Sequence, residues 1–211
     1  VIGKDVDSCV GDVADMRIEA QGKAEFLDMG VPDIFDYETL KIRTRELAFL
    51  NKGLQLTLRD DRDDEDTQGE KFLYEGGISE YVRFINQGKT PIHDNIIHLD
   101  GEKNGIFFEV ALQYNSGYNE NIYSFVNNIN THDGGTHEDG VKRALVRTIN
   151  AYARKNNILK DKDENLKEDD VKEGLTMIIS CKHPNPQFEG QTKGRLGNSE
   201  VRGLADSVFS E

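Results

Sequence analysis

A stretch near the carboxyl end of the chain carries the residue types that bind phosphate. It contains Gly190, Gly194 and Gly197, with Lys193 between the first two. Glycine frees the backbone to approach a ligand closely, and a lysine ammonium reaches a phosphate as a point charge. The spacing differs from the phosphate-binding motif GxxxxGK[ST]. An exposed flexible connection with ordinary surface cations fits the same residues, and composition alone favours that second interpretation.

Two further features could contact phosphate. Residues 133–136 (Asp-Gly-Gly-Thr) precede the longest predicted helix. They form either an anion site at its amino terminus or a tight turn with an N-cap, and the local residues favour the turn. Lys142, Arg143 and Arg147 follow on the early turns of the same helix. They form either a solvated helix face or a basic stripe that faces phosphates.

The other reactive side chains indicate no metal or covalent site. The five histidines lack metal-ligand spacing, although His132 and His137 flank the glycine pair and could meet. The aspartate run 60–66 lacks the glycine and terminal glutamate of a calcium loop. Cys9 and Cys181 are far apart, which predicts two reduced thiols and a cytoplasmic protein rather than a disulfide scaffold or a zinc site.

The charge balance constrains the partners. The 211 residues include 26 Lys+Arg and 39 Asp+Glu, for a net charge of −13. This argues against a protein that wraps nucleic acid, but leaves open one whose basic groups are gathered on one surface. Much of the acid lies at 60–66 and 161–170, which we predict to be solvent-facing loops. No apolar run approaches the roughly 18 to 20 residues that span a bilayer, so we expect no membrane.

The spacing of apolar residues predicts a mixture of helices and strands. Helices are expected from the cap Asp36 to Gly53, over 78–85, from a Thr136/Asp139 capping box to Tyr152, and over 201–208. Strands are expected at 54–58, around 72–74, and at 96–102, 106–114, 121–128 and 175–181. Asn104-Gly105 is a strong hairpin signal. The predicted fold class is α/β or α+β with a mixed sheet.

Several of these stretches resemble the transducer domain of DNA gyrase B, which is part of a type IIA topoisomerase. The similar motifs are RELAFLNKG at 45–53, YEGGI at 74–78, NNINT at 127–131, GGTHE at 134–138, QFEGQTK at 187–193 and LGNSE at 196–200. The resemblance assigns residues 36–211 to the transducer. Residues 1–35 stay unassigned, with a remnant of the end of the ATP-binding domain as one interpretation.

The resemblance implies a fold like the second domain of ribosomal protein S5. It also implies that Gln191, Thr192 and Lys193 reach the γ-phosphate of ATP in the neighbouring ATP-binding domain, with Lys193 sensing phosphate and Gln191 orienting water. The helix face of Lys142, Arg143 and Arg147 would line a DNA-holding cavity, since that face does so in the family.

The implied cofactors are ATP and Mg²⁺, both bound mainly by a domain absent from this chain. We therefore expect the chain alone to hydrolyse no ATP. The implied partners are the gyrase A subunit, a second gyrase B protomer that dimerises on ATP binding, and double-stranded DNA. Two alternatives stay open: a topoisomerase IV B-type subunit, and a non-catalytic module whose acidic surface meets protein partners.

Overall fold

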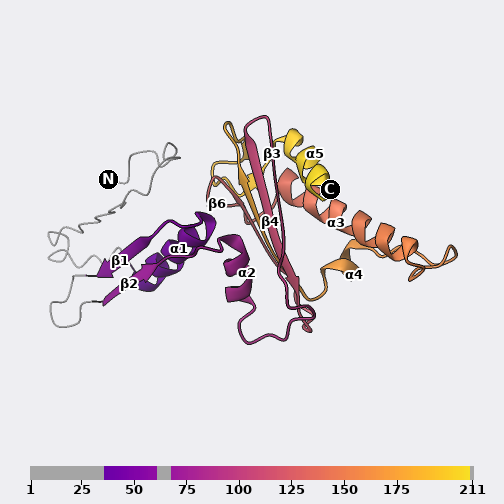
Figure 1. Cartoon of the computed structure of the whole chain (residues 1–211). Coiled ribbons are helices and arrows are strands. Elements are labelled where there is room, and N and C mark those ends of the chain that lie inside the picture. Colours follow the sequence, from indigo (N-terminus) through magenta and orange to yellow (C-terminus); the bar gives the residue numbers. More distant parts are fainter. Residues whose placement is uncertain (1–35, 61–67, 210–211) are drawn as a thin grey trace. The chain divides into compact units, whose positions relative to one another are not determined.

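The structure, a computed structural model, describes residues 36–60 and 68–209 (Figure 1). The chain forms two compact units that divide between Gly77 and Ile78. The described part of the first unit holds α1 (Tyr37–Leu50), β1 (Leu56–Asp60) and β2 (Gln68–Phe72). The second unit holds α2 (Ile78–Ile85), β3 (Ile97–Lys103), β4 (Ile106–Tyr114), β5 (Asn121–Val126), β6 (Ile129–Asn130), α3 (Thr136–Lys155), α4 (Glu168–Lys172), β7 (Leu175–Lys182), β8 (Phe188–Glu189), β9 (Arg195–Leu196) and α5 (Ser199–Val208).

The first unit is a helix beside a hairpin, as predicted. Asp36 caps α1, because its carboxylate accepts a hydrogen bond of 2.8 Å from the Thr39 backbone N–H. Strands β1 and β2 pair antiparallel, with Leu56 opposite Phe72. Ala48 of α1 packs against these two side chains in a small core. The acidic connection predicted between the strands lies largely in 61–67, outside the described residues.

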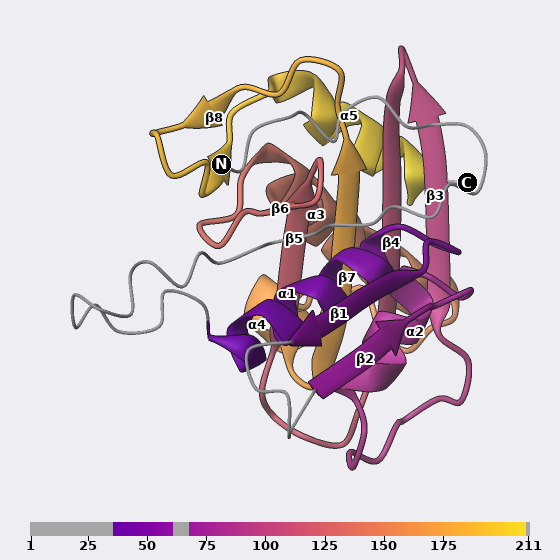
Figure 2. The same cartoon turned by 90° about the vertical axis from the view of Figure 1, so that its left-hand side faces the viewer.

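A mixed five-stranded sheet organises the second unit, in the order β3-β4-β7-β5-β6 (Figure 2). Strands β5 and β7 are parallel, while β3, β4, β7 and β6 each pair antiparallel with a neighbour. The predicted hairpin between β3 and β4 turns at Asn104 and Gly105, whose φ angles are 56° and 75°. Two successive positive φ angles suit this pair and match the twist of the strands. The predicted mixed α/β class is confirmed.

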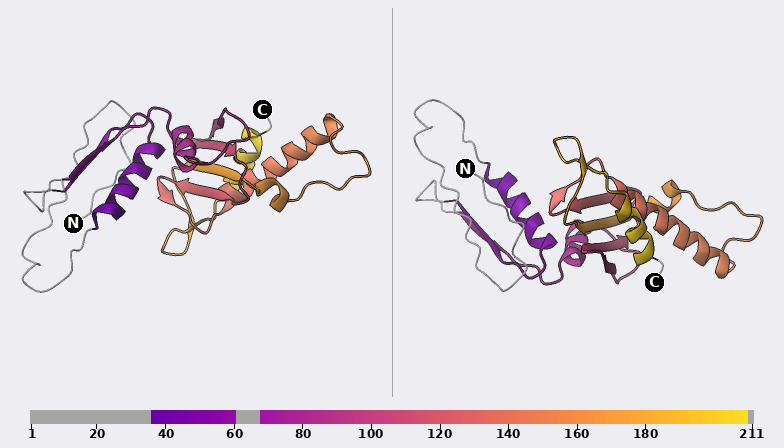
Figure 3. Two further views of the ribbon diagram at one scale, coloured as in Figure 1. Left: turned by 90° about the horizontal axis from the view of Figure 1, so that it is seen from below. Right: turned by 90° about the horizontal axis from the view of Figure 1, so that it is seen from above.

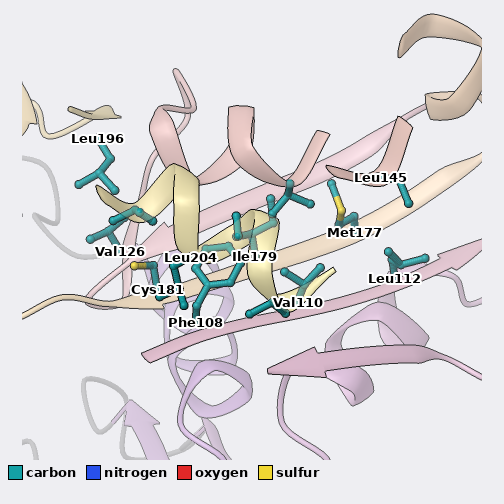
Figure 4. Close-up of a cluster of buried hydrophobic side chains, with 14 of the residues drawn as sticks. Phe108, Val110, Leu112, Val126, Leu145, Met177, Ile179, Cys181, Leu196 and Leu204 are labelled. Carbon is teal, nitrogen blue, oxygen red and sulfur yellow. The ribbon is translucent and has the colours of Figure 1, made fainter. Parts of the chain in front are cut away.

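One face of the sheet carries the main hydrophobic core, beneath α3 and α5 (Figure 4). Phe108, Val110 and Leu112 alternate along β4, while Met177 and Ile179 do so along β7, and all five are buried. Side chains two residues apart share a face of a strand, so these residues meet the helices together. Burial of this apolar area is the main stabilising contribution to the unit.

The opposite face of the sheet meets α2 through a polar network. Thr176 Oγ1 donates a 2.7 Å hydrogen bond to Asn86 Oδ1, and Asn86 Nδ2 donates one of 3.0 Å to Gln113 Oε1. All three side chains are buried, so each hydrogen bond offsets the cost of removing a polar group from water. The network fixes the end of α2 against β4 and β7.

The long helix α3 begins and ends differently from the prediction. Its N-cap is Gly135, and the buried Thr136 hydroxyl makes no hydrogen bond to any described residue. The predicted capping box is therefore wrong, because Thr136 lies inside the first turn instead of before it. At the other end, Tyr152 is 63% exposed, and the end of the helix extends beyond the sheet (Figure 3). The predicted apolar stripe is buried only at Val141 and Leu145 and partly buried at Ile149.

The shortest helix and strands were not predicted from the sequence. Helix α4 begins within the stretch 161–170, which was predicted to be a solvent-facing loop, and its Val171 is buried. The two-residue strands β6, β8 and β9 have no periodic signal to detect. None of the helices within 36–60 and 68–209 is long and apolar enough to cross a membrane.

Candidate functional site

The loop 190–194 is the turn of the short hairpin formed by β8 and β9. Gln191, Thr192 and Lys193 are all exposed on this turn. The backbone is left-handed at Gly190 and at Lys193, with φ angles of 79° and 56°. The Lys193 ammonium lies 5.8 Å from the centre of the Phe188 ring, a cation–π contact. The turn thus presents an amide, a hydroxyl and an ammonium group to solvent.

The structure joins this loop to the glycine pair before α3, two features that the sequence left separate. The Asp133 N–H donates a 2.9 Å hydrogen bond to the Gly194 carbonyl, and the Leu196 N–H donates one of 3.2 Å to the Gly134 carbonyl. At Gly135 and Gly194 the two segments lie too close together to admit a side chain. A Cβ at Gly135 would lie 2.5 Å from the Leu196 backbone, and one at Gly194 would lie 2.6 Å from Asp133 Oδ2.

Ionic contacts surround the base of the loop. Arg195 Nη1 donates a 2.9 Å hydrogen bond to the Asp133 carbonyl. The same guanidinium lies 3.6 Å from the Asp139 carboxylate on α3 and 3.4 Å from the Glu189 carboxylate on β8. Arg202 on α5 also lies 3.6 Å from Asp139. Sequence reasoning missed the contacts that join Arg195 and Arg202 to Asp139, because no local pattern pairs residues so far apart in the chain.

The amino terminus of α3 is occupied by a carboxylate of the chain itself. Glu138 lies against Gly134, where a Cβ would come within 3.2 Å of its carboxyl carbon. Its carboxylate accepts a 2.8 Å hydrogen bond from Ser124 Oγ and lies 2.7 Å from Lys142 Nζ. A carboxylate in the first turn of a helix is stabilised by the partial positive charge of the helix amino terminus. A tight turn precedes the helix, as the sequence favoured, but it spans 131–134, where the Gly134 N–H donates a 2.8 Å hydrogen bond to the Thr131 carbonyl, and Gly135 takes the N-cap position.

The two histidines beside the glycine pair have different environments. His137 is fully buried, with Nε2 2.9 Å from Thr131 Oγ1, and burial lowers its pKa from 6.5 to about 4. The His132 side chain is 62% exposed and lies 3.3 Å from the Asp133 carboxylate. In the described part of the chain, no group of three or more His, Cys, Asp or Glu residues could hold a metal ion.

The cysteines are described only in part. Cys181 is a free, buried thiol, and burial raises its pKa to about 12. The thiol is therefore neutral and unreactive at physiological pH. Cys9 lies outside the described residues.

The predicted basic stripe on α3 divides between two sides of the helix. Arg143 and Arg147 lie one turn apart and line the same groove, which has a volume of about 530 Å³. Arg154 lines it further along, and Asn165 and Leu166 close it from the segment before α4. Lys142 is about 140° around the helix from Arg147, at about 100° per residue. It pairs with Glu138 instead.

Each cation of the stripe has a distinct environment. Arg147 Nη1 donates a 2.6 Å hydrogen bond to Asp206 on α5, although both side chains are about half exposed. The Arg143 side chain is exposed. The Lys142 side chain is only 20% exposed. Arg143 and Arg147 therefore offer more accessible positive charge than Lys142.

The side chains of the loop fit a terminal phosphate group. Lys193 supplies charge, while the Gln191 amide and the Thr192 hydroxyl supply further donors. Among the described residues, no group of three or more His, Cys, Asp or Glu near this loop could hold a metal ion. The site as described could donate hydrogen bonds and one positive charge to an anion such as phosphate.

The fold resembles that of the ATPase regions of gyrase-type topoisomerases. The crystal structure of the 43K ATPase domain of Thermus thermophilus gyrase B has a TM-score of 0.72 and 34% identity, over 83% of this chain and 46% of that one. The topoisomerase IV ATP-binding domain of Francisella tularensis shares the fold, with a TM-score of 0.68 and 24% identity, over 86% of this chain and 48% of that one.

The family model of DNA gyrase B matches residues 77–211, and the chain belongs to the DNA gyrase B family. It is 60% identical over 177 residues to the DNA gyrase B protein of Bacillus mycoides, covering 84% of this chain and 43% of that protein. It is 54% identical over 178 residues to the corresponding protein of Staphylococcus aureus, covering 84% of this chain and 28% of that protein. The chain thus spans less than half the length of these relatives.

Proposed function

We propose that residues 36–211 act as the transducer of a DNA gyrase B protein, coupling ATP binding and hydrolysis to closure of a DNA gate and to strand passage. The observation that carries the proposal is the exposed turn of Gln191, Thr192 and Lys193, set on a base that is fastened to the start of α3. Membership of the DNA gyrase B family supports it. The turn is free to meet a ligand, while its base is tied to the helix that carries Arg143 and Arg147.

In this proposal the three side chains of the turn have separate roles. Lys193 places its ammonium on the γ-phosphate, Gln191 orients the attacking water, and Thr192 adds a hydroxyl donor. ATP, with its Mg²⁺, supplies the phosphate whose charge the loop senses. A fixed cation is effective there, because phosphoryl transfer depends on positioning and on stabilising developing charge. Loss of the γ-phosphate removes the contact with Lys193, which releases the loop and shifts the population of conformations.

The remainder of the nucleotide site is assigned to an ATP-binding domain outside this chain. We therefore expect the 211-residue chain alone to release no phosphate from ATP above the buffer rate. Phosphate release should be measured with Mg²⁺ at millimolar ATP, with the complete subunit as the positive control. Turnover by the chain that disappears in a Lys193→Ala variant would contradict this assignment.

Arg143 and Arg147 are proposed to contact DNA phosphates, with Lys142 beside them. Replacing both arginines with glutamate in the complete subunit should weaken DNA binding. The slope of log K against log salt should also fall by about 0.9 for each lost phosphate contact. Lys142→Glu should have a smaller effect, because the Lys142 side chain is only 20% exposed.

The control is Lys103→Glu, the same charge change per substituted residue, at an exposed hairpin end. Salt titrations of DNA binding would compare all the variants with the parent protein. A double arginine variant that behaves like Lys103→Glu would remove these residues from the DNA interface.

The proposal also assigns the partners of the family to this chain. They are the gyrase A subunit, a second gyrase B protomer that joins on ATP binding, and double-stranded DNA, all in the cytoplasm. Family membership supports these assignments. The same membership favours gyrase over topoisomerase IV.

A further inference from the structure

The hairpin that carries Lys193 is too short to fix its own position. Strands β8 and β9 share two residue pairs, Phe188 with Leu196 and Glu189 with Arg195. An isolated two-stranded hairpin is at best marginally stable in water. The direction in which Lys193 projects must therefore be set by contacts at the base of the hairpin.

Arg195 connects that base to the segment before α3 and to α3 itself. Its guanidinium bonds the Asp133 carbonyl before α3, at 2.9 Å, and lies near carboxylates of Asp139 on α3 and Glu189 on β8. A guanidinium offers several donors in one rigid plane, so one side chain can serve several acceptors. The side chain is 41% exposed, and such ion pairs add little stability. The contacts of Arg195 therefore affect the direction of the hairpin more than the free energy of unfolding.

The Asp139 carboxylate extends the connection to α5. It lies 3.6 Å from Arg202 as well as from Arg195. The two helices pack closely at this level, because a Cβ at Gly140 would come within 2.9 Å of the Ala205 Cβ. Arg195 therefore attaches the loop to a pair of helices that cannot easily move apart.

We propose that Arg195 is a positioning residue, which holds the base of the hairpin on α3 and α5 so that Lys193 projects in one direction. This inference rests on the proposed role of Lys193. Arg195 does not act on the nucleotide itself, since its guanidinium is engaged with protein acceptors. Its effect on Lys193 passes through Asp133 and Asp139.

The first test is hydrogen exchange in the 211-residue chain. The amides of Asp133, Lys193 and Leu196 donate the hydrogen bonds that close the loop and its base. In Arg195→Ala they should exchange about three- to tenfold faster, the equivalent of one lost hydrogen bond.

Arg195→Lys should also speed exchange, because a single ammonium does not span three acceptors. Amides of β7 should stay unchanged in both variants, and Arg83→Ala, at an exposed position on α2, should change none of them. Unchanged exchange at the loop in Arg195→Ala would overturn the proposal.

The second test is ATP hydrolysis by the complete subunit. Arg195→Ala should lower kcat about 10- to 100-fold with little change in KM, because a displaced group can cost up to about 100-fold in rate. Asp139→Asn should lower kcat in the same direction. The double variant should be little worse than Arg195→Ala, since both changes break one connection.

Other results would separate this inference from the proposed function. A full rate in Arg195→Lys, or a raised KM in Arg195→Ala, would mean that the charge acts on the nucleotide directly, which overturns the positioning role. If Lys193→Ala lowers turnover while Arg195→Ala does not, the positioning role alone fails. If Lys193→Ala is neutral, both the proposed function and the positioning role fail.

Discussion

Replacing Lys193 with alanine in the complete subunit should lower kcat for ATP hydrolysis by about 10²- to 10³-fold, the usual cost of removing one preorganised charge-stabilising group. The exposed ammonium has one described side-chain contact, with the Phe188 ring. Such a contact contributes on the order of 0.5–1 kcal/mol at an exposed site. The loss of rate should therefore occur in a folded protein.

The control for this experiment is Lys182→Ala, which removes an exposed lysine at the end of β7. Steady-state turnover and the urea unfolding midpoint would be measured for both variants. Lys182→Ala should keep the parent rate, and both midpoints should stay close to that of the parent. Parent-like turnover in Lys193→Ala would refute the proposed phosphate contact.

The elements that the sequence predicted well are those whose apolar residues repeat with a clear period. Val110 and Leu112 alternate along β4, and Val201, Leu204 and Val208 follow a helical spacing on α5, and all of them are buried. Asn104-Gly105 was equally predictable, since few other residue pairs accept two positive φ angles. In each case the pattern lies within one stretch of the sequence, so neighbouring residues suffice to predict the element.

The parts that could not be predicted depend on contacts between distant segments. Nothing near Gly135 indicates that it meets the Leu196 backbone, and this close approach makes glycine the N-cap in place of the expected threonine. Tyr152 follows the apolar period of α3 but is exposed, and the carboxyl end of this helix extends beyond the sheet. Periodicity predicts which face of a helix is apolar, but not how far its partner extends.

The acidic surplus also has a structural role that net charge does not show. Glu138 holds Lys142, and Asp139 lies between Arg195 and Arg202. These carboxylates fix cations around the candidate site instead of facing solvent as a uniform acidic surface. A chain of net charge −13 can thus present an exposed Lys193 and a groove lined by arginines.

Replacing Gly135 with alanine should lower the free energy of unfolding of the 211-residue chain by about 3 kcal/mol. Its φ of 139° is strained for any residue with a side chain. The new Cβ would also lie 2.5 Å from both the N and the O of Leu196, and a backbone cannot rotate aside. The hairpin base would have to move off the start of α3, so turnover by the complete subunit should fall as well.

The matched control is Gly203→Ala in α5, where no other atom lies within 4 Å of the added Cβ. Alanine is favoured over glycine inside a helix, so this variant should gain about 0.5–1 kcal/mol. Urea unfolding of both variants would compare the same chemical change at a crowded and an open position. If Gly135→Ala were as stable as Gly203→Ala, the loop base would not be pressed against α3, and Lys193 would lack the fixed support on which its proposed role depends.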